Sequence, residues 1–258
     1  MTSTDKCISL WLPKVRVSPS IRLRLFCLPY AGGSAAIFQN WFGFFLETID
    51  ICPIQLPGRG MRMHESPIEE LSSLVKAIVR EISPYLEVPF AFFGHSLGGL
   101  IGFEVSHRLA KEHLPIPAHL FTSGCAAPSR QKCRRRLSSL PESALIEELR
   151  KLNGTPQAVL ENNELMALVL PALRTDFSLF ESYCYQQHPR LLGCPITVFG
   201  GSEDTEVDLG QLASWKDETH GRFTLHLLPG DHFFLHSAET ELLTLMAQQI
   251  RSFTCKAA

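Results

Sequence analysis

Short apolar runs recur along the chain and predict β-strands at residues 23–28, 51–56, 90–93, 118–122, 196–199 and 224–228. Most of these runs are continuously hydrophobic and do not alternate between apolar and polar positions. Continuous runs are typical of strands that helices cover on both faces, as in a parallel sheet. The pattern therefore predicts a mostly parallel central sheet with helices on each side.

Helical periodicity fills several of the gaps between these runs. Apolar residues recur at three- and four-residue spacing over residues 67–87, 97–112 and 239–253. This spacing places them on one face of a helix. Strands that alternate with helices indicate an α/β fold, and we expect one domain over residues 1–258.

One long segment, residues 127–187, interrupts this alternation. No strand pattern occurs in it, whereas SLPESALIEELRKL and ENNELMALVLPALRTDFSLFESY both have the spacing of amphipathic helices. A helical segment between two strands predicts an insertion over one edge of the sheet. We interpret this insertion as a lid.

Composition narrows the class of protein. The 258 residues are 45% hydrophobic and 19% charged, with a net charge of −2, which argues against an electrostatic nucleic-acid binder. Eight cysteines are scattered without a C-x-x-C pair, so we expect reduced thiols and no zinc or disulfide framework. No apolar stretch approaches about 18 residues, and the N-terminus lacks the features of a secretory signal. We therefore expect a cytoplasmic protein that does not enter a membrane. We also expect a monomer, since nothing in the sequence demands a partner subunit.

The stretch FFGHSLGG at residues 92–99 contains the clearest chemical signal. A serine is a poor nucleophile unless a base accepts its proton and donors stabilise the oxyanion. The G-x-S-x-G pattern fits a sharp turn from strand to helix, where Gly94 and Gly98 leave out side chains that would obstruct the turn. An apolar run precedes this motif and a helical stripe follows it. We predict that Ser96 is a nucleophile.

Such a turn predicts an acid and then a histidine later in the chain, each following a strand. Asp204 follows the run at 196–199, with Glu203 and Asp208 as competitors for the role of acid. His232 follows the run at 224–228 and is the expected base, with His236 as the alternative.

The oxyanion hole is expected to use two backbone N–H groups. Leu97, directly after the serine, provides one of them. The other is assigned to Ala31 in the loop PYAGGS, which follows the first predicted strand. Together these residues describe acyl transfer by a serine hydrolase.

Six separated segments carry a more specific resemblance: LFCLPYAGGSA, QLPGRGMR, FFGHSLGG, VLPALRTDF, VFGGSED and LPGDHFFL. In this order they closely resemble the type II thioesterases of nonribosomal peptide and polyketide synthases, which belong to the α/β-hydrolase superfamily. The match runs from about residue 20 to 252. The resemblance implies an α/β-hydrolase fold with a helical lid, which would fall near residues 127–187.

The resemblance also implies a substrate: an acyl or aminoacyl thioester on the phosphopantetheine arm of an acyl or peptidyl carrier protein. Hydrolysis would clear stalled or mis-primed arms, without a cofactor or metal of the enzyme's own. The family's nucleophile, acid and base fall on Ser96, Asp204 and His232, and its oxyanion donors on Ala31 and Leu97. The basic run at residues 130–136 could meet the acidic surface of a carrier, but the pattern favours a solvated lid entrance.

Three other functions remain open at this stage. A medium-chain fatty acyl thioesterase that terminates fatty acid synthesis belongs to the same superfamily. A generic esterase or lipase would use the same residues. A noncatalytic carrier-binding module on a hydrolase scaffold is the alternative of another class, and the retained Ser96, Asp204 and His232 argue against it.

Overall fold

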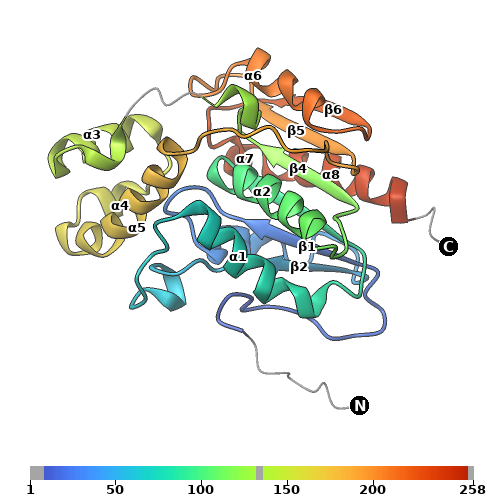
Figure 1. The fold of residues 1–258 in the computed structure, drawn as a ribbon. Coiled ribbons are helices and arrows are strands. Elements are labelled where there is room, and N and C mark those ends of the chain that lie inside the picture. The colour runs from blue at the N-terminus through green and yellow to red at the C-terminus, as the bar shows by residue number, and fades with distance from the viewer. Residues whose placement is uncertain (1–8, 132–135, 255–258) are drawn as a thin grey trace.

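The computed structural model describes residues 9–131 and 136–254, and its centre is a parallel six-stranded sheet (Figure 1). The order across the sheet is β2-β1-β3-β4-β5-β6, and each strand runs parallel to its neighbours. The strands are β1 (Leu23–Leu28), β2 (Ile49–Pro53), β3 (Phe90–His95), β4 (His119–Ser123), β5 (Ile196–Gly201) and β6 (Phe223–Leu228). The predicted α/β-hydrolase fold class is confirmed.

Apolar side chains on both faces of the sheet explain the continuous runs. In β1, Phe26 and Leu28 belong to one core, and Leu25 and Cys27 belong to the other. Successive side chains of a strand point to opposite faces, so each face needs its own cover. Figure 1 shows α1 (Leu71–Ile82) and α2 (Leu97–Lys111) in front of the sheet and α8 (Glu239–Thr254) behind it.

Strand β2 begins and ends earlier than its apolar run predicts. It spans Ile49–Pro53, whereas the run covers residues 51–56. Asp50 lies inside the strand because it is buried against Arg16 and Arg24, at 3.1 and 3.6 Å. The apolar residues just beyond the strand, such as Ile54, are buried in the core, and the Ile54 N–H still donates to the Cys27 carbonyl of β1 at 2.8 Å, although the strand itself ends at Pro53. Hydrophobicity alone therefore misplaces this strand's ends.

The predicted helices are present, and one of them is shorter than the pattern predicts. The pattern at 67–87 yields α1 and then a 3₁₀ turn, η3 (Ser83–Tyr85), while residues 67–70 stay outside the helix. The remaining short elements are η1 (Ala35–Trp41), η2 (Gly60–Arg62), η4 (Pro128–Arg130), α6 (Leu209–Ala213), η6 (Ser214–Glu218) and α7 (Phe234–Ser237).

The segment between β4 and β5 is helical throughout its described elements and lies to one side of the sheet (Figure 1). It contains η5 (Leu137–Ser139), α3 (Glu142–Leu152), α4 (Gln157–Leu160) and α5 (Asn163–Glu181). The short helix α4 was not predicted. These helices share a small core of their own, which includes Leu145, Leu149, Met166 and Leu170. We refer to residues 127–187 as the lid, and its role as a lid stays a prediction.

Two expectations from composition can be compared with the described residues. None of the helices there is long and apolar enough to cross a bilayer. Free thiols are found at Cys27, Cys52, Cys125, Cys184 and Cys194. Cys7, Cys133 and Cys255 lie outside the described residues.

A buried histidine in β4 makes stability depend on pH. Burial lowers the pKa of His119 from its ordinary 6.5 to about 4, and its Nε2 lies 2.9 Å from the Thr197 hydroxyl. The unfolded chain binds this proton below about pH 6.5 and the folded chain does not, so stability is lost as the pH falls from 6.5 toward 4. From pH 7 to pH 5 we expect a loss of about 2 kcal/mol from this group.

Urea unfolding at the two pH values measures this loss. His119→Gln keeps a polar group near Thr197 but does not titrate, so its stability should fall by about 2 kcal/mol less than that of the natural chain. Equal losses in the two proteins would contradict the prediction.

Candidate active site

The candidate residues all follow strands at one edge of the sheet. Ala31 follows β1, Ser96 follows β3, Asp204 follows β5 and His232 follows β6. The carboxyl ends of parallel strands meet at the same edge, where ligands of open α/β sheets bind. Ala31, Ser96, Leu97 and His232 line a single cavity there. The fold thus brings together residues that are far apart in the sequence.

Ser96 occupies a strained turn between β3 and α2. Its backbone has φ 51° and ψ −117°, a conformation that costs energy for a residue with a side chain. A Cβ at Gly94 would lie 2.1 Å from the Gly98 carbonyl oxygen, and a Cβ at Gly98 would lie 2.2 Å from the Leu28 carbonyl oxygen. The glycines are therefore required because backbone passes directly over them.

A substitution pair on α2 tests this close approach. Gly98→Ala places a methyl group against the backbone of β1, which cannot yield, so we expect a loss of about 1–3 kcal/mol in unfolding free energy and impaired activity. Gly102→Ala, one turn later, meets only side chains, the nearest at 3.3 Å, and gains helix propensity. Urea unfolding of both variants should show the loss at Gly98 only; comparable stabilities would contradict this reading of the turn.

His232 and Asp204 form a hydrogen-bonded pair beside the serine. His232 Nδ1 lies 2.8 Å from Asp204 Oδ2, and the Asp204 side chain is fully buried whereas that of His232 is 12% exposed. The other carboxylate oxygen of Asp204 accepts the N–H groups of Glu206 and Val207, at 2.8 and 3.2 Å. With Nδ1 bound to a carboxylate, the Nε2 atom is left for proton transfer.

The competing candidates lie elsewhere. Glu203 is exposed, and Asp208 caps the N-terminus of α6 by accepting the Gln211 N–H at 2.8 Å. His236, in α7, has its Nε2 atom 3.1 Å from the hydroxyl of Tyr30. Asp204 and His232 are therefore the acid and histidine that the structure pairs. The described residues contain no hydrogen bond between Ser96 and His232, a contact that often tightens only with substrate bound.

The histidine before the serine, His95, packs against the His232 ring with 5.2 Å between ring centres. It is fully buried, with Nδ1 2.9 Å from the Ser123 hydroxyl. Burial, and then the neighbouring His232 and His236, hold the pKa of His95 well below its usual range. A neutral His95 places no second positive charge beside a protonated His232.

Ala31 and Leu97, the residues with the candidate oxyanion-hole N–H groups, line the same cavity as Ser96. Neither Ala31 N–H nor Leu97 N–H donates to a carbonyl or side chain within the described residues. The Leu97 group is at the first position of α2, where helical N–H groups have no intrahelical acceptor. The Gly33 N–H donates to the Tyr30 carbonyl at 2.9 Å and closes a tight turn around Ala31. Both N–H groups can therefore bind an oxyanion.

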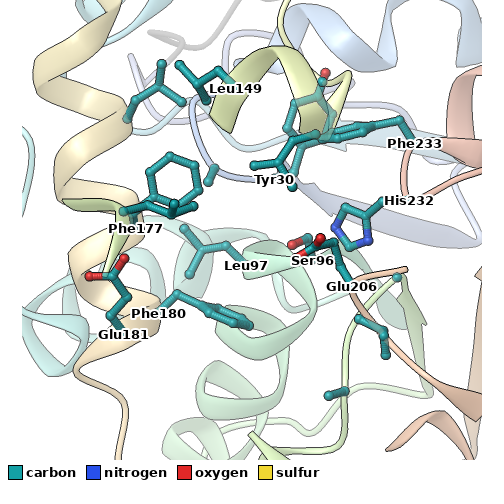
Figure 2. Close-up of a pocket in the computed structure, with 18 of the residues that line it drawn as sticks. Tyr30, Ser96, Leu97, Leu149, Phe177, Phe180, Glu181, Glu206, His232 and Phe233 are labelled. Atoms are coloured by element: carbon teal, nitrogen blue, oxygen red, sulfur yellow. The ribbon is translucent and has the colours of Figure 1, made fainter. Parts of the chain in front are cut away.

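The cavity has a volume of about 160 Å³ and is walled largely by the lid. Figure 2 shows Ser96 and His232 on one side, with Leu149, Phe177 and Phe180 of the lid across from them. Polar lining residues that sequence reasoning did not identify include Gln131, Glu181, Glu206 and Gln211. No local pattern marks them, because Gln131 and Glu181 come from the lid, Glu206 and Gln211 come from the segment after β5, and only tertiary packing brings the two segments together.

The basic run lies at the start of the lid. Arg130 and Arg136 are exposed, and Lys132, Arg134 and Arg135 lie outside the described residues. Contact of this run with an acidic partner stays a prediction. Nowhere in residues 9–131 and 136–254 are three His, Cys, Asp or Glu side chains grouped so that they could hold a metal ion.

Comparison with known proteins shows which family the chain belongs to. A family model for the thioesterase domain matches residues 23–250. The chain is 42% identical over 244 residues to the gramicidin S biosynthesis protein GrsT of Aneurinibacillus migulanus, covering 95% of each chain. It is 33% identical over 232 residues to the human medium-chain S-acyl fatty acid synthase thioesterase, covering 88% of this chain and 86% of the human one.

A solved structure extends the match to three dimensions. The type II thioesterase BorB from the borrelidin biosynthetic cluster superposes with a TM-score of 0.83 at 33% identity, covering 91% of this chain and 94% of BorB. The family model, the relatives and the superposition all span most of the chain. The chain belongs to the thioesterase domain family and is a type II thioesterase of the kind found with nonribosomal peptide and polyketide synthases.

Proposed function

We propose that the protein hydrolyses acyl or aminoacyl thioesters on the phosphopantetheine arm of carrier proteins and so clears stalled or mis-primed synthases. One observation carries the proposal. A serine in a strained turn shares a cavity with a carboxylate-bound histidine and with two N–H groups that have no acceptor among the described residues. The similarity to proteins of antibiotic biosynthesis supports the choice of a carrier-bound substrate.

In the first half of the proposed reaction, His232 Nε2 accepts the proton of the Ser96 hydroxyl. The serine oxygen attacks the thioester carbonyl carbon, and the carbonyl oxygen takes the negative charge. The N–H groups of Ala31 and Leu97 stabilise this oxyanion. Asp204 holds the imidazole in the required tautomer and stabilises it when it is protonated. The carbon–sulfur bond then breaks, and His232 returns the proton to the leaving thiolate.

In the second half, water replaces the carrier thiol. His232 takes a proton from the water, whose oxygen attacks the acyl-serine ester. The same two N–H groups stabilise the second oxyanion. Breakdown returns the proton to Ser96 and releases the free acid. The free pantetheine thiol of the carrier is then available for reloading.

The size of the cavity favours short acyl groups. Its volume of about 160 Å³ is close to that of an engineered cavity of about 150 Å³ that holds one benzene ring. An acetyl, propionyl or small aminoacyl group fits such a space, whereas a ten-carbon chain would extend beyond it. The cavity therefore favours editing over termination of medium-chain fatty acid synthesis.

The test loads acetyl, aminoacyl and decanoyl groups onto a phosphopantetheinylated carrier protein and follows their release by intact-protein mass. Ser96→Ala is the control for enzymatic release. Fast release of acetyl or aminoacyl groups by the natural chain, lost in the variant, is the expected result.

The other outcomes select the alternatives. Release confined to decanoyl groups would identify a chain-terminating thioesterase. Faster turnover of oxygen esters than of the matching thioesters would indicate a generic esterase. Binding of the carrier without release of any group would indicate a noncatalytic module, and would overturn the proposal.

A further inference from the structure

A carboxylate of lid helix α5 binds the loop that contains Ala31. Asp176 Oδ2 accepts the Gly32 N–H at 2.7 Å. The same helix packs directly on this glycine, since a Cβ at Gly32 would lie 2.4 Å from Leu173 Cδ2. Gly32 also has φ +75°, in the region that favours glycine. The position of this loop therefore depends on the position of α5.

Asp176 is held in turn by Arg59 of the loop after β2. The guanidinium donates to both carboxylate oxygens, with Nη2 to Oδ1 at 2.9 Å, and its Nε donates to the Pro57 carbonyl at 3.2 Å. The side chains of Arg59 and Asp176 are only 7% and 1% exposed. Because the pair is bidentate and almost fully shielded from solvent, Arg59 holds the Asp176 carboxylate in one orientation and also balances its charge.

A second contact from the same loop holds the other end of the Ala31 segment. Gln55 Oε1 accepts the Ala35 N–H at 3.1 Å, and Gln55 Nε2 donates to the Arg59 carbonyl at 2.9 Å. The segment from Gly32 to Ala35 is thus bound at one end by Asp176 and at the other by Gln55, and Arg59 hydrogen-bonds to both of these side chains. Neither Arg59 nor Asp176 lines the cavity or contacts the reacting atoms.

The turn geometry explains how these contacts reach Ala31. Gly33 N–H binds the Tyr30 carbonyl, which belongs to the same planar peptide unit as Ala31 N–H. The next peptide unit contains the Gly32 N–H, which Asp176 accepts. Both peptide planes that flank Ala31 are therefore restrained, the second of them by the lid.

We propose that Asp176 is a positioning residue for the oxyanion hole, oriented by Arg59, and that seating of lid helix α5 is what places Ala31 N–H for catalysis. This inference rests on the proposed function of Ala31. A lid displaced from the sheet would lose the bond to Gly32 and leave the hole incomplete. The enzyme would then be competent only when the lid is seated.

The test compares two variants that remove the charge of a buried, arginine-paired aspartate. Asp176→Asn keeps the shape of the side chain but weakens the hold on Gly32 and Arg59. Asp50→Asn is the matched control, since Asp50 is equally buried and paired with Arg16 and Arg24, but lies in β2 away from the cavity. Both variants are expected to lower the thermal midpoint.

Only Asp176→Asn is expected to impair turnover of acetyl-pantetheine, by about tenfold in kcat, with KM within twofold of the natural value. Complete removal of an oxyanion donor costs about 10²–10³-fold, so a displaced donor loses part of that. Inhibition by an alkyl boronic acid, which forms a tetrahedral adduct on serine, should weaken by the same factor as kcat/KM. Binding of a pantetheine thioether, which forms no adduct, should not change.

Several results would overturn the inference. Unchanged kcat and boronate affinity in folded Asp176→Asn would do so, as would equal losses of kcat in Asp50→Asn. Arg59→Lys, which keeps the charge but not the bidentate geometry, should show a loss in the same direction as Asp176→Asn. If Ser96→Ala retained the activity of the natural chain, the proposed function itself would fail, which distinguishes the two cases.

Discussion

Replacing Ser96 with alanine is expected to lower kcat for acyl-pantetheine hydrolysis by about a millionfold. Losses of this scale follow removal of the nucleophile in serine hydrolases, because the remaining residues cannot form the acyl-enzyme. Alanine removes only the hydroxyl and leaves the strained turn and its glycines intact. Thiol release with a chromogenic thiol reagent measures the rate, and intact-protein mass detects the acyl adduct of the natural chain.

The fold of this variant should be unchanged. No hydrogen bond of the Ser96 hydroxyl occurs among the described residues, so its removal leaves no buried partner without a bond. Thermal unfolding and circular dichroism of the two proteins should coincide. Activity within tenfold of the natural chain, in a correctly folded variant, would refute the assignment of Ser96 as the nucleophile.

Replacing Asp204 with asparagine is expected to lower kcat by about 10⁴-fold. The carboxylate accepts a hydrogen bond from the Nδ1–H group of His232, at 2.8 Å, which leaves Nε2 unprotonated and free to act as a base. An asparagine can present its amide N–H₂ to Nδ1 instead and so favour the tautomer with the proton on Nε2. That tautomer cannot accept a proton from Ser96. The pH dependence of kcat/KM of the variant and the natural chain measures this effect.

Two neighbouring acids provide controls for the same experiment. Glu203→Gln alters an exposed side chain, and Asp208→Asn alters the cap of α6 while keeping an oxygen that can accept the Gln211 N–H. Both variants should keep kcat within about threefold, as expected of surface changes remote from the reacting atoms. A larger loss in Glu203→Gln than in Asp204→Asn would transfer the role of acid to Glu203.

Sequence reasoning was most accurate where a local pattern carries the structure. The run at 23–28 became β1 without change, and the G-x-S-x-G motif predicted the turn at Ser96 with the geometry observed. Both depend on the period of a strand or on steric limits within a few residues. The order of serine, acid and histidine was also predictable, since each follows a strand that its own hydrophobicity reveals.

Prediction from the sequence was less accurate where a residue is buried because of contacts with a distant segment. Asp50 lies within β2 because two arginines from other segments neutralise its charge, and no local sequence pattern predicts these contacts. The choice among Glu203, Asp204 and Asp208 depended on which carboxylate the loop turns toward His232. A shift of one residue in that loop would place a different carboxylate beside His232, and no pattern in the sequence predicts such a shift.

The sequence by itself determined the α/β architecture, the position of the strained turn with its candidate nucleophile, and the chemical class, because these follow from periodicity, glycine placement and residue order. Only the tertiary structure decided which acid pairs with His232, how large the acyl cavity is and how the lid reaches the oxyanion loop. Arg59 and Asp176 are separated by 117 positions in the chain yet form one buried ion pair. Contacts of that kind arise when helices and loops pack, and the energy that selects them is shared by residues that no single stretch of sequence contains.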